Sequence, residues 1–267
     1  MRLSIDHITH YQYNEPVGFA LQQVRMTPKD RPDQQIVHHW TIEVEGGAVQ
    51  LHYADHHGNG VDLISVNSGA QELVIRCRGE IELLESHGIV GPHRGPMPLW
   101  AYLRPTGLTD AGVNIQALLE NLGGEFDNDL GRAHSLSASI LQSLPYEIGV
   151  TGADTTAEQA LTGRGGVCQD HAHIFITAMR ALGHPARYAS GYLKMDGRDQ
   201  QDATHAWAEA YFDHVGWVGF DVSNGQSPDE RYVRVATGLD YQEAAPVRGM
   251  RYGSAQETLQ VALQVQQ

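Results

Sequence analysis

Apolar and polar residues alternate over much of the first 85 positions, and this period of two most restricts how the chain can fold. The alternation runs through residues 36–44, 49–53 and 73–77. Successive side chains of a β-strand point to opposite faces, so each run predicts a strand with one buried face. Turn-forming residues separate the runs, notably Gly46-Gly47 and the cluster at 55–60. Residues 1–85 are therefore predicted to form a small antiparallel β domain that resembles a sandwich.

The next stretch differs in composition. Seven of the twenty residues from Ser86 to Pro105 are glycine or proline. Proline removes a backbone donor and fixes φ, which suits neither the interior of a helix nor a central strand. We interpret residues 86–108 as a linker between two domains.

Beyond the linker the pattern becomes helical. Thr109 or Asp110 is expected to cap a first helix, and a second helix is predicted at 129–143. The sequence Thr155-x-x-Glu158 has the form of a capping box for a short third helix. A longer helix is predicted at 168–183, ending at a glycine.

The period of two then returns. Strands are predicted at 187–193, at 204–212, at 217–221 and at 258–265. Helices followed by a run of strands indicate an α+β fold rather than alternating βαβ units. We therefore predict a second domain at 109–267, with helices packed on an antiparallel sheet and the C-terminal strand included.

Charge and hydropathy exclude several classes of partner. The formal net charge is −14 with histidine neutral, whereas nucleic acids and anionic lipids are bound by clustered Lys and Arg. No apolar run approaches the ~20 residues that span a bilayer. The expected partner is a peptide or protein substrate, with no nucleic acid and no membrane. Nothing in the sequence sets an oligomeric state.

The cysteine count and the N-terminus favour a cytoplasmic protein. Only Cys77 and Cys168 occur, so no disulfide framework is implied. The first seven residues include an acid and a histidine where a signal peptide would be apolar.

Cys168 is the residue best placed for chemistry. It follows Gly165, Gly166 and Val167 and begins a predicted helix. The free N–H groups and the positive dipole end of a helix N-terminus stabilise a thiolate. The same N–H groups can hold the oxyanion that forms when a thiolate attacks a carbonyl.

Such a nucleophile needs a proton carrier and a group that orients it. His205 lies in a predicted strand between small alanines, and Asp221 ends the following strand. If a turn at 213–216 joins these strands as antiparallel neighbours, the two side chains lie close together. Asp221 would then fix the tautomer of His205 and support its charged form. Each residue alone also has an ordinary structural explanation, as a core thiol, a packed histidine or a turn residue.

Four blocks of sequence resemble the core of bacterial transglutaminase-like proteins. They are Gly166–His173, Ala186–Tyr192, His205–Ala210 and Gly216–Asp221, and His7–Val17 resembles the β domain that often precedes this core. The resemblance implies a papain-like α+β core with the triad Cys168, His205 and Asp221 in that order. One departure is His171, where relatives usually carry an aromatic residue such as Phe.

Five further residues are candidates for supporting roles. Gln169, Tyr146 and Trp207 are assigned to substrate or oxyanion contacts. Asp170 and His173 are assigned to the layer behind the site. Asp170 near a helix N-terminus also has a simpler explanation as a dipole partner, and Trp207 as a core residue.

No cofactor and no metal are predicted. The chain contains 15 histidines, among them His7-x-x-His10, His38-His39, His52 with His56-His57, and His171-x-His173. None of these matches His-Glu-x-x-His or a paired Cys-x-x-Cys site.

The favoured function is a cysteine-dependent hydrolase, a protease or amidase that cleaves an amide or isopeptide bond through a thioester. The alternative is a transglutaminase, in which an amine takes the acyl group. Hydrolysis is preferred because the chain is small and lacks an evident calcium loop or secretory signal. A third hypothesis is a non-enzymatic scaffold with the same fold.

Overall fold

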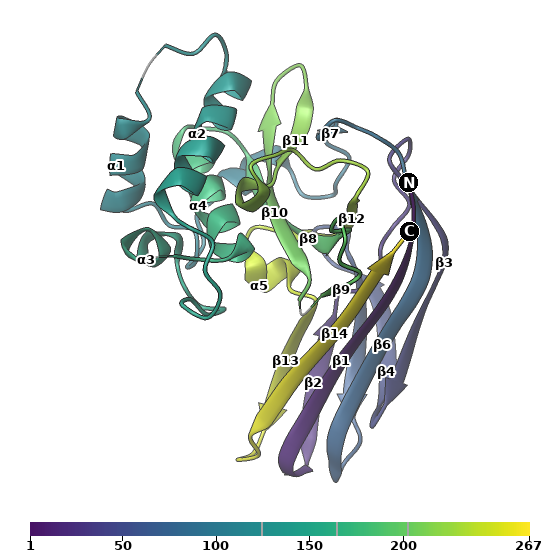
Figure 1. Cartoon of the computed structure of the whole chain (residues 1–267). Helices are drawn as coiled ribbons and strands as arrows, with labels where there is room; N and C mark the ends of the chain where they lie inside the picture. The colour runs from purple at the N-terminus through teal and green to yellow at the C-terminus, as the bar shows by residue number, and fades with distance from the viewer. Residues whose placement is uncertain (124, 164, 202) are drawn as a thin grey trace.

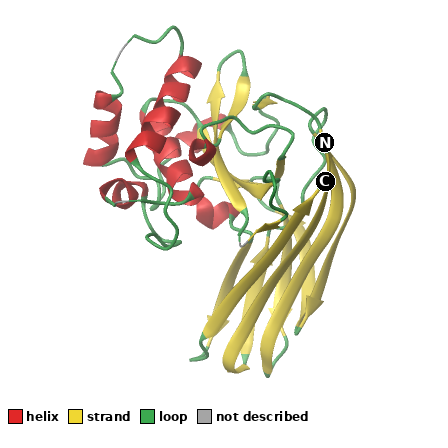
Figure 2. Ribbon diagram, in the orientation of Figure 1, coloured by secondary structure: helices red, strands yellow, loops and turns green. Residues whose placement is uncertain are grey.

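The computed structural model describes residues 1–123, 125–163, 165–201 and 203–267. Its strands form three antiparallel sheets, and its helices gather against one of them (Figures 1 and 2). The fold is α+β, as the sequence predicted. Within the described residues, no helix is both long and apolar enough to cross a lipid bilayer.

Two of the sheets face each other and form what we call the β unit. One has the order β3-β6-β1-β14-β9 and the other the order β13-β2-β5-β4. Leu73 and Ile75 from the first sheet share a buried cluster with Val24 and Ile64 from the second. Burying one such side chain contributes about 1.5–3 kcal/mol, so this shared core holds the sheets together. The strands are β1 (Arg2–Val17), β2 (Phe19–Val24), β3 (Gln35–Glu45), β4 (Gly47–Ala54), β5 (Gly60–Val66), β6 (Ala70–Leu83), β9 (Gln200–Gln201), β13 (Val247–Tyr252) and β14 (Glu257–Gln266).

The last two long strands belong to the β unit, which differs from the predicted grouping of the C-terminal strand with 109–267. β14 pairs with β1 over ten positions, and β13 pairs with β2. Leu263 and Val265 of β14 are buried against Leu3 and Ile5 of β1. Alternation identified the strand correctly but carries no information on its partner, and the pairing brings the two termini together (Figure 1).

The third sheet forms the core unit together with the helices. Its order is β12-β8-β10-β11-β7. Its strands are β7 (Ile89–Gly91), β8 (Ala186–Leu193), β10 (His205–Phe212), β11 (Gly216–Phe220) and β12 (Tyr232–Gly238). The helices are α1 (Val113–Asn121), α2 (Asp129–Ser143), α3 (Ala157–Thr162), α4 (Cys168–Ala181) and α5 (Tyr241–Ala244).

Helix α4 is the central helix of the core unit. One face of β10 presents Ala206, Ala208 and Ala210, which share a buried cluster with Phe175 and Met179 of α4. Small side chains on the strand let the helix approach the sheet closely, so the start of α4 is held against the start of β10.

The predicted linker contributes structure to the core unit. β7 pairs with β11 and forms the edge of the sheet, and a short 3-10 helix, η1, spans Leu99–Leu103. The edge position of β7 agrees with the placement of the prolines after it, because an edge strand loses little when a backbone donor is missing.

The predicted caps of two helices are wrong in detail. The capping box of α3 is made by Thr156 and Gln159. Glu158 instead accepts hydrogen bonds from the backbone N–H groups of Gly112 (2.8 Å) and Ile115 (2.9 Å), where α1 begins. Neither Thr109 nor Asp110 caps α1, because this carboxylate from another helix satisfies its free N–H groups.

Side-chain amides join the β unit to β12 of the core unit. Gln35 donates to the carbonyl of Arg234 and accepts from its N–H, both at 3.0 Å. Asn59 does the same with Thr237, at 2.7 and 2.9 Å. Each side-chain amide therefore forms with β12 the pair of hydrogen bonds that a neighbouring strand would form. These bonds fix the interface between the two units.

Candidate active site

Cys168 is the first residue of α4 and its thiol is partly buried. The segment before it is fixed by backbone hydrogen bonds from Glu147 to Gly166 (2.8 Å) and from Gly166 to Pro145 (3.1 Å). A side chain at Gly166 would come within 2.9 Å of Asp170, so glycine is required there. The residue predicted as the nucleophile thus sits at a fixed helix start, where the first N–H groups have no partner within the helix.

Asp170 locks the first turn of α4. One oxygen of its buried carboxylate accepts hydrogen bonds from the Val167 N–H (2.8 Å) and the Thr151 hydroxyl (2.7 Å). A carboxylate at a helix N-terminus also interacts favourably with the dipole. These contacts hold the backbone around Cys168 in place.

His205 and Asp221 lie together, buried, at one end of the core sheet. Strands β10 and β11 are antiparallel neighbours, as predicted, and His205 begins the first while Asp221 follows the second. The Nε2 atom of His205 lies 2.6 Å from an Oδ atom of Asp221. The Cys168 thiol lies close enough to His205 to contribute to the pKa of the imidazole. Because Nε2 is engaged by Asp221, Nδ1 is the ring nitrogen left for the sulfur.

These contacts set the charge of the pair. Burial alone would lower the pKa of His205, but the hydrogen bonds with Asp221 and Cys168 outweigh it and raise that pKa to about 10. Burial would likewise raise the pKa of Asp221, yet its hydrogen bonds, first with His205, bring it below the usual value. At neutral pH the imidazole is therefore charged beside the thiol, an arrangement that stabilises a thiolate.

Two residues near Asp221 escaped the sequence prediction. Its Oδ2 atom accepts further hydrogen bonds from the Asn224 amide and from the Tyr232 hydroxyl, each at 2.7 Å. Gln226 in turn donates to the Tyr232 oxygen at 2.7 Å. Asn224 lies three residues after Asp221, a spacing typical of local capping, whereas Tyr232 is on another strand and left no local signal.

Trp207 lies behind the imidazole. Its ring stacks near His205 with centroids 6.4 Å apart, and it meets Tyr232 edge-on at 5.5 Å. Only 3% of Trp207 is exposed. A side chain so covered presents little surface to a substrate, so the geometry favours shielding of the His205–Asp221 pair over substrate contact.

Tyr146 and Gln169 lie on the exposed side of Cys168. Tyr146 is half exposed, and burial together with nearby Cys168 and Asp221 raises the pKa of its hydroxyl. The Gln169 amide is already engaged, because it donates to the carbonyls of Ala153 (3.2 Å) and Gly152 (3.5 Å). Of the two, Tyr146 is the better placed for an incoming carbonyl.

The two histidines of α4 have separate structural contacts. His171 accepts from Ser223 (2.7 Å) and donates to the Leu144 carbonyl (2.8 Å), which ties α4 to the 3-10 helix η2 (Val222–Asn224) after Asp221. Buried His173 accepts from the Tyr241 N–H at 3.1 Å, and burial lowers its pKa to about 3. His171 therefore supports the Asp221 segment, while His173 supports α5.

A separate group of possible metal ligands lies between the 55–60 turn of the β unit and α5 of the core unit. The ligand atoms of His56, His57 and Glu243 all fall within 4.8 Å of one another. His57 already pairs with Glu243 at 2.7 Å, which joins the 55–60 turn to α5. This cluster was not singled out from the sequence because Glu243 is distant in the chain.

The fold and these residues define the class: an α+β protein with a papain-like core and an N-terminal β domain. The transglutaminase-like superfamily matches residues 116–222, and the bacterial transglutaminase-like N-terminal region matches residues 3–82. The chain belongs to the transglutaminase-like superfamily.

Two relatives of similar length are described as uncharacterized proteins. One from Mycobacterium leprae is 26% identical over 99% of this chain and 98% of its own length. One from Mycobacterium tuberculosis is 27% identical over 97% of this chain and 90% of its own. A "Protein-glutamine gamma-glutamyltransferase" of Pseudomonas aeruginosa is 30% identical over 152 residues, which are 47% of this chain and 22% of that protein.

A solved structure has the same fold over the whole chain. It is described as "a Putative Cysteine Protease from Cytophaga hutchinsonii", with a TM-score of 0.76 and 22% identity. The match covers 100% of this chain and 90% of that one. At this identity the likeness concerns the fold.

Proposed function

We propose that this protein is a cysteine-dependent hydrolase that cleaves an amide or isopeptide bond. Cys168 is the nucleophile, His205 carries the proton and Asp221 orients His205. The observation that supports this most directly is the 2.6 Å contact between buried His205 and Asp221, with the Cys168 thiol near enough to raise the pKa of the same imidazole.

The reaction begins when the Cys168 sulfur attacks the carbonyl carbon of the substrate. The negative charge that develops on the oxygen is received by backbone N–H groups at the start of α4. Tyr146, half exposed and close to the thiol, is the side chain that could add a hydrogen bond there.

The charged imidazole supplies the next proton. His205 donates it to the departing amine, the C–N bond breaks and a thioester forms on Cys168. A water molecule then attacks the thioester while His205 removes its proton. The carboxylic acid leaves and the thiol is restored. Asp221 lowers the cost of the imidazolium throughout, with Asn224 and Tyr232 holding its carboxylate in place.

The second candidate is transfer of the acyl group to an amine. Its support is the 30% identity to the glutamyltransferase of Pseudomonas aeruginosa over about half of this chain. The thioester would be the same, so the two functions differ only in what attacks it.

A trapping experiment tests the shared step. The protein is incubated with cell extract or with a panel of glutamine and isopeptide substrates, and an adduct on Cys168 is identified by peptide mass. C77A is the matched control, because it removes the other cysteine. An adduct on Cys168 in the wild type and C77A is expected. Absence of any adduct and any turnover across the panel would favour the non-enzymatic scaffold.

A second measurement separates water from amine. Ammonia release from a glutamine substrate is followed with and without added primary amine, and the product is weighed by mass spectrometry. Hydrolysis predicts glutamate as the product in both cases. An amine conjugate as the main product would establish the transferase instead.

A further inference from the structure

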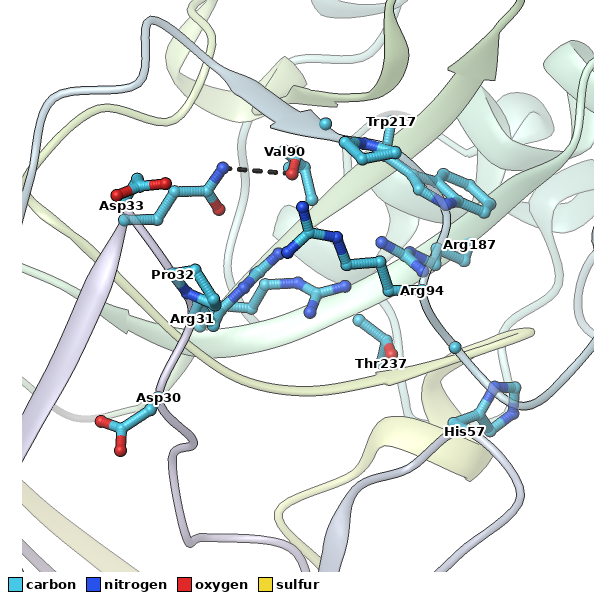
Figure 3. A pocket seen from close by; sticks show the side chains of 15 residues that line it. Asp30, Arg31, Pro32, Asp33, His57, Val90, Arg94, Arg187, Trp217 and Thr237 are labelled. Atoms are coloured by element: carbon cyan, nitrogen blue, oxygen red, sulfur yellow. Dashed lines mark hydrogen bonds between the residues drawn. The ribbon is translucent and has the colours of Figure 1, made fainter.

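A cavity of about 370 Å³ lies at the interface of the β unit and the core unit, and four arginines line it. Arg31 comes from the segment between β2 and β3, Arg94 from the linker, Arg187 from β8 and Arg234 from β12. Figure 3 shows the side chains of Arg31 and Arg94 extending into the same space, with Arg187 beside Trp217. In a chain with a net charge of −14, this gathering runs against the overall charge.

One carboxylate faces these guanidinium groups from within. Glu209 of β10 is fully buried and accepts from Nε of Arg187 (2.6 Å) and from two nitrogens of Arg234 (2.6 and 2.8 Å). Burial alone would raise the pKa of Glu209, but the neighbouring arginines lower it to about 2. Glu209 is therefore charged, and it balances only one of the inner guanidinium groups.

Asp30 and Asp33 also line the cavity, but among the described residues neither forms an ion pair with Arg31 or Arg94. Among the described residues, no group accepts a hydrogen bond from the guanidinium of Arg31 or of Arg94. Burial, then repulsion from Arg234, lowers the pKa of Arg31. Asp30 is at the rim, where it accepts from the Val37 N–H at 2.7 Å, and Figure 3 shows its carboxylate turned away from the arginines.

The cavity walls hold the arginines in position. The guanidinium carbon of Arg187 lies 3.8 Å from the centre of the Trp217 ring, so its plane is supported by the indole. Arg31, Arg187 and Arg234 act on the one buried carboxylate of Glu209, which leaves an excess of two positive charges around it, while Asp33 of the cavity lining is exposed to solvent. A phosphate monoester carries about −1.5 to −2 near neutral pH and three acceptor oxygens. Guanidinium forks match that geometry with paired hydrogen bonds.

We propose that this cavity, bounded by Arg31, Arg94, Arg187 and Arg234, binds the phosphate group of a small molecule. Its volume lies within the range of small-ligand pockets, about 300–1,000 Å³. Free phosphate and a phosphate monoester share the recognising chemistry, so both are probes. Arg31 and Arg94 form the hydrogen bonds with the ligand, while Arg187 and Arg234 add to the positive electrostatic potential of the cavity.

This site is distinct from Cys168. Glu209 and His205 lie on one face of β10, four residues apart, and Trp207 lies between them. Phosphate binding therefore requires no thiol chemistry. A C168A protein binds phosphate as the wild type does, and this holds whether or not the proposed hydrolase activity is found.

The test uses the full chain and isothermal titration calorimetry with inorganic phosphate and glycerol 3-phosphate at constant ionic strength. Saturable binding with one site is expected, and the tighter probe tells whether the site takes free or esterified phosphate. The double variant R31Q/R94Q should weaken binding at least about tenfold, since it removes two charged donors. These two arginines are chosen because, within the described part of the chain, neither side chain donates a hydrogen bond to the protein.

R104Q is the matched control, because Arg104 is an exposed arginine beyond the cavity. It should bind phosphate as the wild type does, and equal melting temperatures of the variants would show that all are folded. Unchanged phosphate affinity in R31Q/R94Q would overturn the proposal. So would equal binding of succinate, or a response reproduced by sodium chloride alone.

Discussion

Two buried charged clusters lie on one face of β10 and differ in their balance of charge. At the start of the strand, His205 meets Asp221, one positive group with one negative. Four residues later, Glu209 meets three arginines. Burying a charge is costly unless a partner compensates it. The charges of the first cluster balance, whereas the second has one carboxylate for three guanidinium groups. The comparison supports different roles for the two clusters: the first activates the Cys168 sulfur, and the second binds an anionic ligand.

The largest effect on activity is expected when the sulfur of Cys168, next to the first cluster, is removed. C168A should lower turnover of any substrate found by trapping by more than about 10⁴-fold, because no thioester can form. Initial rates of the purified variant provide the measurement. C77A should keep most of the activity if the vacated space is tolerated, since Cys77 is buried in the β unit. Retained turnover in C168A would place the chemistry elsewhere.

The two thiols should also differ in reactivity. Iodoacetamide at pH 6 should label Cys168 far faster than Cys77. The imidazolium of His205 favours a thiolate at the first, while burial raises the pKa of the second thiol. Peptide mass spectrometry over time gives both rates from one sample. Equal slow labelling would contradict the pairing of Cys168 with His205.

Breaking the balance of the first cluster should change its pH dependence. D221N removes the charge that supports the His205 imidazolium, so activity should fall by about 10²–10⁴-fold. In the wild type, activity should decline as pH rises through about 10, where His205 loses its proton. In D221N this decline should begin at lower pH. A profile measured from pH 5 to 11 tests it, and an unshifted decline would mean that another group titrates.

The raised pKa of His205 also predicts how the stability of the fold depends on pH. His205 titrates near 6.5 in an unfolded chain and near 10 in the fold. Its contribution is therefore complete below pH 6.5 and is lost progressively as pH rises toward 10. Urea unfolding of the wild type and D221N across this range should show a steeper loss in the wild type.

The sequence predicted the elements and the first cluster much better than their surroundings. Alternation and helical spacing depend on neighbouring residues, so α2 was found at its exact bounds and β10 nearly so. The glycines before Cys168 are also a local signal. Partners that arrive from distant strands leave no such signal. Tyr232 on Asp221, and β14 beside β1, depend on tertiary packing that spacing does not encode.

The second cluster could not be found from the sequence for the same reason. Arg31, Arg94, Arg187 and Arg234 are scattered over about two hundred positions of an acidic chain. Only the fold brings them around Glu209. A net charge of −14 correctly argues against a long basic surface, but it says nothing about a local excess of two charges inside one cavity.

Removing the negative group of the second cluster should destabilise the fold. E209Q leaves Arg187 and Arg234 without their carboxylate, and breaking a buried pair costs about 3–5 kcal/mol. The free energy of unfolding in urea measures this loss. E80Q is the control, because Glu80 pairs with Arg2 at the surface, where solvent screens the pair and its loss should change stability little. If the cavity binds phosphate, saturating phosphate should recover more stability in E209Q than in the wild type.

The smallest effect on activity is expected when Asp221 loses one of its hydrogen-bond donors. Y232F removes one hydrogen bond of 2.7 Å to its carboxylate and keeps the ring that packs on Trp207. A hydrogen bond to a charged group contributes about 1.5–3 kcal/mol, but His205 and Asn224 still hold Asp221, so a loss of about tenfold in kcat is expected. The alkaline decline should stay close to that of the wild type, since the charge of Asp221 is retained. A large shift of that decline in Y232F, equal to that of D221N, would mean that the hydroxyl sets the charge of the cluster rather than its geometry.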